Sequence, residues 1–259
     1  MTVETGTRPP EVELVLSEPL KPQLAELQRT FAIGTEVVAV LAGTPHRFQC
    51  RVHSSDIPVI FDTFVGLYHL PPVHLPPSPV IVDLGANIGC TMVHYASLYT
   101  GARIVGVELD AENVRLAKIN TAAMSERITL LHAAIAPTDG LARYSGQEAW
   151  GYRVDDRGDR TAVALSMSSL LGRSGISTVD FLKVDIEGGE RELFEGPLPW
   201  MSAVNSLAVE VHDDERFLER LIDLLTTHGL QAARDPHHWS AVIAGRAVQS
   251  PRPDSGPTA

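Results

Sequence analysis

From residue 79 onward the chain alternates between short apolar runs rich in β-branched residues and longer stretches with apolar positions at helical spacing. Each apolar run predicts a strand that is buried on both faces. The runs are Val80 to Asp83, Arg103 to Glu108, Ile128 to His132, Val179 to Asp185 and Ser206 to Val211. Leu230 to Arg234 and Trp239 to Ala244 predict a closing antiparallel pair. Strands that alternate with helical segments indicate an α/β fold, here a doubly wound, mostly parallel seven-stranded sheet of Rossmann-like type.

Before residue 78 the pattern changes. Pro22 to Phe31 predicts a short helix, and Val37 to Ala42 with Arg47 to His53 predicts a hairpin. Residues 1 to 20 have little periodicity and predict a loosely held start. Prolines at 71, 72, 76, 77 and 79 form a stiff connector. We therefore divide the chain into a small N-terminal extension at 1–78, a core at 79–246 and a disordered tail at 247–259.

A further segment, residues 137 to 160, holds many Gly, Asp and Arg residues and only scattered apolar positions. We expect a long loop or a β-excursion there, and long loops in compact domains often serve function. Thr161 to Leu165 then predicts a short strand, followed by a helix that starts near Ser168.

Charge and composition narrow the function classes. The net charge of -11 and the pI near 5.3 argue against nucleic acid as the partner, because phosphate binding draws on clustered Lys and Arg. No run of about 18 apolar residues predicts a membrane span, and Thr2 to Pro10 lacks the pattern of a signal peptide, so we expect a cytoplasmic location. Cys50 and Cys90 are too few for a disulfide framework or a cysteine zinc site. A homodimer is an oligomeric state that the sequence leaves open.

Polar residues stand where the predicted strands end. In an open α/β sheet, ligands bind at this edge, where the strand order switches direction. The strand-end residues are Asp83 with Gly85, Ala86 and Asn87 after it, then Glu108, then Ala133 and Ala134, then Asp185, and finally Glu210 with His212. The sequence therefore predicts a ligand site along this edge.

The turn after the first of these strands indicates which ligand is held. A dinucleotide requires G-x-G-x-x-G, but Asn87 stands where the second glycine would be and Gly89 comes one residue early. Asp83 also places a carboxylate near the expected diphosphate, which Coulomb repulsion disfavours. A ligand with an ammonium and no phosphate fits better, and S-adenosylmethionine is such a ligand. Glu108, 23 residues after Gly85, is then placed to bind the ribose diol.

At this point the chain resembles the FkbM-type methyltransferases, which have the class I S-adenosylmethionine-dependent fold. The resemblance covers about residues 50 to 245 and rests on Val82 to Gly89, Val107-Glu108 with Asn120, Asp180 to Glu190 and Leu207 to His212, with Ser55-Asp56 and Tyr68 upstream. It implies methyl transfer to a hydroxyl oxygen of a sugar or other secondary-metabolite acceptor, with the extension at 1–78 as a cap on the acceptor side. The sequence departs from the family at Ser168, where an Asp is common, although a serine still caps a helix.

Cofactor binding and catalysis are assigned to two sets of residues that share Asp185. We expect cofactor contacts from Tyr68, Asp83, Gly85, Ala86, Asn87, Gly89, Glu108, Leu109, Ala133, Ala134 and Asp185. An acceptor alcohol must lose its proton to a base, or bind a metal that lowers its pKa. His212 is the preferred base, with Asp185 and Glu210 beside it as catalytic residues. Asp185 and Glu210 are also candidate anchors for Mg2+ or Ca2+, with Glu187 and His212 as further ligands.

The remaining candidates carry weaker signals. Asp185 and Glu187 have the alternative of capping the following helix and binding backbone or cofactor amines. His237 and His238 lie in the predicted hairpin turn, where we expect surface exposure rather than ligation. Trp150, Tyr152 and Tyr68 are candidates for covering the acceptor pocket.

Three functions follow from these patterns. The leading hypothesis is an S-adenosylmethionine-dependent O-methyltransferase that acts on a hydroxylated small molecule. Oxygen is favoured because Asp185-Ile186-Glu187-Gly188 stands where amine methylation would place an Asp or Asn followed by two prolines and an aromatic residue. The alternatives are a nicotinamide-dependent oxidoreductase on the same fold, disfavoured by the glycine spacing, and a catalytically silent binding protein that keeps the cofactor fold.

Overall fold

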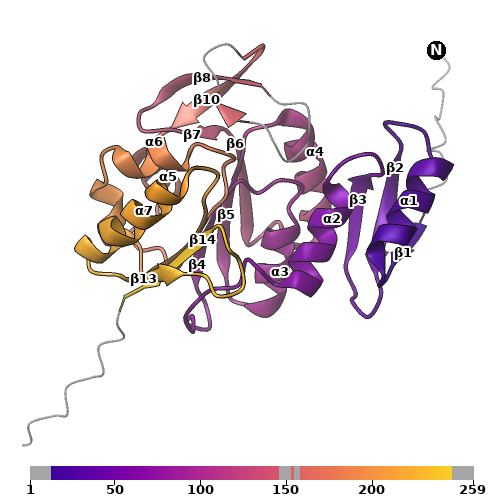
Figure 1. Ribbon diagram of the computed structural model, residues 1–259, viewed down its shortest axis with the longest axis horizontal. Helices are drawn as coiled ribbons and strands as arrows, with labels where there is room; N and C mark the ends of the chain where they lie inside the picture. Colours follow the sequence, from indigo (N-terminus) through magenta and orange to yellow (C-terminus); the bar gives the residue numbers. More distant parts are fainter. Residues whose placement is uncertain (1–12, 146–152, 155–157, 247–259) are drawn as a thin grey trace, which may run out of the picture.

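The computed structural model describes residues 13–145, 153–154 and 158–246, and its centre is one twisted sheet of seven strands (Figure 1). The strand order is β13-β14-β12-β11-β4-β5-β6. The parallel strands are β4 (Val80–Leu84), β5 (Arg103–Glu108), β6 (Ile128–His132), β11 (Phe181–Val184) and β12 (Ser206–Glu210), and the antiparallel pair at one edge is β13 (Gln231–Arg234) with β14 (Ala241–Gly245). The predicted doubly wound, mostly parallel seven-stranded fold is confirmed.

Helices cover both faces of this sheet because each parallel strand is apolar on both sides. On β4, Ile81 belongs to a buried cluster with α3 (Cys90–Leu98) and α4 (Ala111–Asn120). The next residue, Val82, belongs to the cluster of the opposite face. That face is covered by α5 (Met167–Ser174), α6 (Glu190–Glu195), α7 (Glu215–Thr227) and the 3-10 turn η3 (Pro199–Ala203). Alternation along the strand thus explains the continuous apolar run in the sequence.

The N-terminal extension builds a second, smaller sheet beside the core (Figure 1). Its strands are β1 (Glu13–Leu16), β2 (Glu36–Leu41) and β3 (Arg47–Arg51), and its helices are α1 (Leu20–Thr30), α2 (Asp56–Phe61) and the π-helical turn η1 (Asp62–Gly66). The predicted helix and hairpin are confirmed. The expectation of a loosely held start is wrong for β1, which pairs in parallel with β2. Four residues without clear alternation carried no strand signal.

Shared side chains join the extension to the core. Phe48 and Ile57 of the extension belong to one buried cluster with Ile88 and Leu116 of the core. Asn120, at the end of α4, accepts a hydrogen bond from the Gln49 backbone amide at 2.7 Å and donates to the backbone carbonyls of Gln49 and Ile88. Residues 13–66 are therefore packed against the loop that follows β4.

The predicted β-excursion is confirmed as a small separate sheet above the core (Figure 1). It consists of β7 (Ala134–Ile135), β8 (Gly140–Ser145), β9 (Arg153–Val154) and β10 (Arg160–Leu165). Trp150 and Tyr152, expected at the acceptor pocket, lie outside the described residues. The helix predicted to start near Ser168 starts at Met167 and is capped by Ser166, whose side chain accepts from the Ser169 amide, so Ser168 is not the cap. A short 3-10 turn, η2 (Ala122–Met124), follows α4.

Candidate functional site

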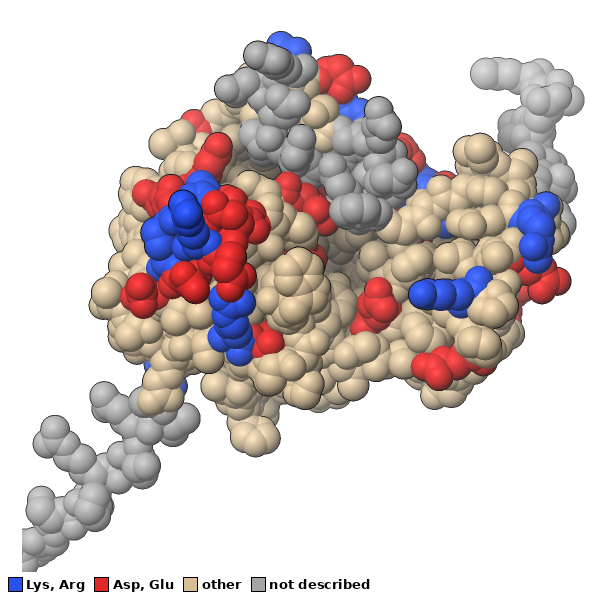
Figure 2. Space-filling model, viewed as in Figure 1, with Lys and Arg blue, Asp and Glu red and all other residues tan. Residues whose placement is uncertain are grey.

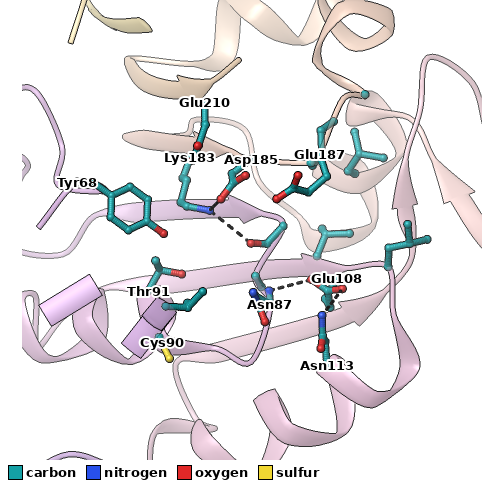
Figure 3. Close-up of a pocket in the computed structure, with 18 of the residues that line it drawn as sticks. Tyr68, Asn87, Cys90, Thr91, Glu108, Asn113, Lys183, Asp185, Glu187 and Glu210 are labelled. Atoms are coloured by element: carbon teal, nitrogen blue, oxygen red, sulfur yellow. Dashed lines mark hydrogen bonds and ion pairs between the residues drawn. The ribbon is translucent and has the colours of Figure 1, made fainter. Parts of the chain in front are cut away.

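A cavity of about 490 Å³ lies at the carboxyl ends of β4, β5, β11 and β12. This is the edge of the sheet that the strand-end residues predicted, and the volume lies within the range of small-molecule sites. Figure 3 shows Tyr68, Lys183 and Glu210 toward one end of the cavity and Glu108 with Asn113 toward the other.

The loop after β4 is built for close approach of two backbones. A Cβ on Gly85 would lie 1.7 Å from the backbone oxygen of Asp185, and the φ angle of Gly85 is 81°. Both observations require glycine at this position. Two residues later, Asn87 has a φ of 48°, and its backbone amide donates to Glu108 at 2.8 Å. The loop is thus held between β11 on one side and β5 on the other.

Glu108 is a buried carboxylate at the end of the cavity that Asn113 also lines. One of its oxygens accepts from the Asn87 amide, and the other accepts from the Asp110 amide at 2.8 Å and from Asn113 at 3.4 Å. Burial raises the pKa of Glu108 to about 7, although these donors work in the opposite direction. A carboxylate has about four lone-pair directions, so Glu108 keeps acceptor capacity for a ligand.

Lys183 is a buried cation in an otherwise apolar strand. Its Nζ lies 3.4 Å from Asp83, 3.2 Å from Asp185 and 3.4 Å from the backbone oxygen of Gly85. Burial opposes the charge, but the attraction of Asp185 and Asp83 holds the pKa of Lys183 well above its usual value. Asp83 also accepts a short hydrogen bond from Thr91 at the start of α3. Lys183 therefore ties β4, the glycine loop and β11 together.

The loop after β11 brings several carboxylates around His212. Glu190 is fully buried and accepts from the backbone amides of Ile186 and Gly188, each at 3.0 Å. It lies 3.2 Å from Nδ1 of His212, whose Nε2 is 3.5 Å from Glu187. Burial lowers the pKa of His212, but Glu190 and Glu187 outweigh it and raise the pKa to about 9. The ring is therefore an imidazolium near neutral pH.

Glu187 shows signs of strain. It has a φ of 55°, which a non-glycine residue adopts only when its surroundings impose it. Burial, followed by the charge of Asp185, raises its pKa to about 8. Leu67 and Asn87 also have positive φ, and they too stand next to or in the cavity wall. Such conformations cluster at functional sites.

Most of the predicted site residues line this cavity. Those that do are Tyr68, Gly85, Ala86, Asn87, Glu108, Leu109, Ala133, Ala134, Asp185, Glu187 and Glu210. Asp83, Gly89 and His212 lie behind the lining: Asp83 is buried under Thr91 and Lys183, Gly89 caps α3, and His212 faces Glu190. Asp185, Glu187 and His212 each bring one ligand atom within 4.8 Å of the others, so three of the four candidate metal ligands converge.

The sequence reasoning missed several lining residues. His237 and His238 were expected at the surface, but both line the cavity, because the β13–β14 turn folds back over the sheet edge; His237 is also exposed, as predicted. Lys183, Thr91 and Asn113 also line it without having been singled out. For Lys183 a signal was present, since a lysine inside an apolar strand is almost never buried unless it is paired.

A family model described as "Methyltransferase FkbM domain" matches residues 83–232, which is more than half of the chain. The chain belongs to the FkbM methyltransferase family. The FkbM resemblance of the strand-end motifs is thereby confirmed, and the chain is a member of a family of methyltransferases. The cavity described above is enclosed mainly by residues of the matched region.

Individual relatives match this chain over different spans. The 31-O-demethyl-FK506 methyltransferase FkbM of Streptomyces tacrolimicus is 26% identical over 204 residues, 63% of this chain and 78% of that protein. A ribosomal RNA small subunit methyltransferase H of Nocardia farcinica is 36% identical over 91 residues, 35% of this chain and 26% of that protein. The crystal structure of a methyltransferase FkbM from Methylobacillus flagellatus superposes with a TM-score of 0.51 at 16% identity, covering 67% of this chain and 45% of that one. This chain thus spans only about a quarter of the ribosomal RNA relative.

Proposed function

We propose that this FkbM-family protein is an S-adenosylmethionine-dependent O-methyltransferase that acts on a hydroxyl of a small molecule, such as a sugar or a secondary metabolite. The observation that carries the proposal is the division of one cavity into two chemically different ends. Glu108, Leu109 and Asn113 supply a carboxylate, an apolar wall and an amide at one end. Asp185 and Glu210 supply carboxylates at the other.

The end of the cavity at Glu108 fits an adenosine. Glu108 already accepts from three donors and retains about one lone pair for a ribose hydroxyl, and Leu109, Ala133 and Ala134 offer an apolar wall for a base. Asn87 closes this end from the loop after β4. The donor set contains no free run of backbone amides for a diphosphate, because the Asn87 amide is already donated to Glu108. This favours a cofactor without phosphates over a dinucleotide.

The acidic end fits a cationic cofactor beside a hydroxyl acceptor. Bound there, S-adenosylmethionine supplies an activated methyl group on a positively charged sulfur. Asp185 lines this end, and one of its oxygens is buried, has no hydrogen-bond partner among the described residues and lies 3.9 Å from Nε2 of His212. Glu210, at the end of β12, lies next to Asp185, and its side chain is 25% exposed. Tyr68 walls the same end from the extension. In this arrangement the described part of the extension, residues 13–78, caps the acceptor side.

Catalytic residues are proposed at the same end. Asp185 and Glu210 contact the acceptor, and His212 balances their charge from behind, 3.9 Å from Asp185 and 3.7 Å from Glu210. The raised pKa of His212 gives it less use as a base than the sequence pattern indicated. Mg2+ or Ca2+ held by Asp185 and Glu187, with His212 beside them, is the competing way to acidify the hydroxyl, and ligation by His212 requires its ring to lose a proton. Loss of activity with EDTA that Mg2+ restores would select the metal, and activity indifferent to EDTA would reject it.

A small acceptor is preferred to RNA on charge. The chain carries a net charge of -11, and on the face drawn in Figure 2 acidic and basic side chains are interleaved rather than gathered by sign. Arg191, for example, is paired with Asp213 and Glu195. Phosphate-backbone binding needs cations that are not already neutralised. The relative that acts on 31-O-demethyl-FK506, by its name, has a small-molecule oxygen acceptor.

The test combines binding and turnover. Titration calorimetry should give micromolar binding of S-adenosylhomocysteine and no heat with NAD. Mass spectrometry should then find a single added methyl group on a member of a panel of methyl glycosides, amino sugars, hydroxy acids and macrolactones. Binding of NAD alone would support an oxidoreductase, and methylation of ribosomal RNA alone would replace the small acceptor. Cofactor binding without transfer to any probe would support the silent binding protein.

None of the helices in the described part of the chain has the length and apolar character to cross a bilayer.

A further inference from the structure

His238 stands at the turn between β13 and β14, and the sheet pairing brings it to the cavity. Strand β14 runs antiparallel to β12, with Ala241 opposite Glu210. The turn is closed by the Ala241 amide, which donates to the His238 carbonyl at 3.0 Å, and by the Asp235 amide, which donates to the Ala241 carbonyl at 2.9 Å. The position of the His238 ring is therefore set by the sheet and not by a free loop.

The ring of His238 has a partner on each nitrogen. Nδ1 lies 3.3 Å from the hydroxyl of Ser240, and Nε2 lies 3.7 Å from Glu210 Oε1. The ring centroid is 5.9 Å from that of Tyr68, which covers the same end of the cavity. In the tautomer whose Nδ1–H donates to Ser240, Nε2 keeps its lone pair. The 3.7 Å gap to Glu210 is too wide for a direct hydrogen bond, which leaves this nitrogen free to accept from a ligand.

His212 has the opposite surroundings. It lies behind the cavity wall and next to the fully buried carboxylate of Glu190. Glu210 Oε1 is 3.7 Å from Nε2 of each of the two histidines, so Glu210 stands between them. Of the two rings, only that of His238 lines the cavity.

We propose that His238 is the general base of the methyl transfer, with Ser240 orienting its ring and Glu210 stabilising the imidazolium that forms. This rests on the proposed O-methyltransferase function. The acceptor oxygen forms a bond to the methyl carbon, the carbon–sulfur bond breaks with its electron pair left on sulfur, and the hydroxyl proton moves to Nε2 of His238. The charged or titratable groups that face the ring are Glu210 on β12, Asp62 on η1 and Tyr68.

The decisive variant is His238→Ala, tested on whichever probe of the acceptor panel the wild type methylates. We expect the rate of transfer at neutral pH to fall by about 100-fold, within the usual range for removal of a general base, while the affinity for S-adenosylhomocysteine changes less than about twofold. Free imidazole should restore at least part of the rate, in proportion to its neutral form. His74→Ala, an exposed histidine far along the chain, serves as the matched control.

His212→Ala separates the two histidines. Imidazole rescue of His212→Ala, without rescue of His238→Ala, would overturn the inference and return the base to His212. An unchanged rate in His238→Ala would overturn it as well. In either of these outcomes the wild type still methylates the probe, so the proposed methyltransferase function stands while the role of His238 fails. Failure of the proposed function would instead appear as a wild type that methylates no probe.

A second measurement requires no acceptor. Side-chain 15N NMR of the full chain saturated with S-adenosylhomocysteine, with the His238 signals assigned from their loss in His238→Ala, reports the position of the ring proton. In the neutral ring we expect the proton on Nδ1, on the side of Ser240. A neutral ring with its proton on Nε2 would overturn the inference even if no probe is methylated.

Discussion

Replacing Lys183 with methionine removes the ammonium that separates two carboxylates in the interior. The side chain of Lys183 is 5% exposed, that of Asp83 is fully buried and that of Asp185 is 18% exposed. Loss of one partner of such a buried network costs about 3–5 kcal/mol, because the remaining charge is left uncompensated. For a chain of this size we expect the Tm to fall by about 6–20 °C.

The pH dependence of this loss has a definite sign. Without the ammonium, Asp83 has a folded-state pKa above its unfolded value, so its ionised form destabilises the variant at high pH. The difference in unfolding free energy between wild type and Lys183→Met should therefore shrink as the pH falls from about 8 to about 5. Adding Asp83→Asn to Lys183→Met should recover part of the loss, because the uncompensated charge is gone.

Urea denaturation followed by circular dichroism measures these quantities, with Lys21→Met on the exposed face of α1 as the control. A loss below about 1 kcal/mol at pH 7.5 would contradict the argument, since it would mean that water reaches the site and screens both carboxylates. A loss that does not change with pH, or that Asp83→Asn does not reduce, would contradict it equally.

Three further predictions concern the loop after β4, His212 and Glu108. Gly85→Ala should abolish binding of S-adenosylhomocysteine in calorimetry, because the added Cβ would lie 1.7 Å from the backbone oxygen of Asp185. Gly172→Ala is the control, and it should bind like the wild type because a Cβ there meets nothing within 4 Å. His212→Asn should lower the unfolding free energy by about 2 kcal/mol below about pH 6.5, where the imidazolium is fully stabilising. In a denaturation series this loss should vanish as the pH rises through about 9. A loss that persists at high pH would exclude the charge as its cause. Glu108→Gln should weaken calorimetric binding of S-adenosylhomocysteine by about 10- to 100-fold, and unchanged affinity would remove Glu108 from the cofactor site.

The local pattern predicted the sheet well because each parallel strand carries its own signal. A strand covered on both faces must be apolar throughout, and the run from Val80 to Val82 is unambiguous for that reason. The same logic predicted the strand-end site, since parallel strands place their carboxyl ends at one edge. Strand β1 was missed because its pairing with β2 is made across more than 20 residues and leaves no periodicity in Glu13–Leu16.

The sequence by itself determined the α/β architecture, the edge of the sheet where ligands bind and the family to which the motifs belong. Only the tertiary structure decided which of the polar residues face the cavity. His212 follows β12 directly but lies behind the wall beside Glu190, whereas His238 reaches the cavity because β14 pairs back onto β12. The physical reason is that strand and helix periodicity are local, while burial, pairing of charges and the approach of a ring to a carboxylate depend on residues distant in the chain.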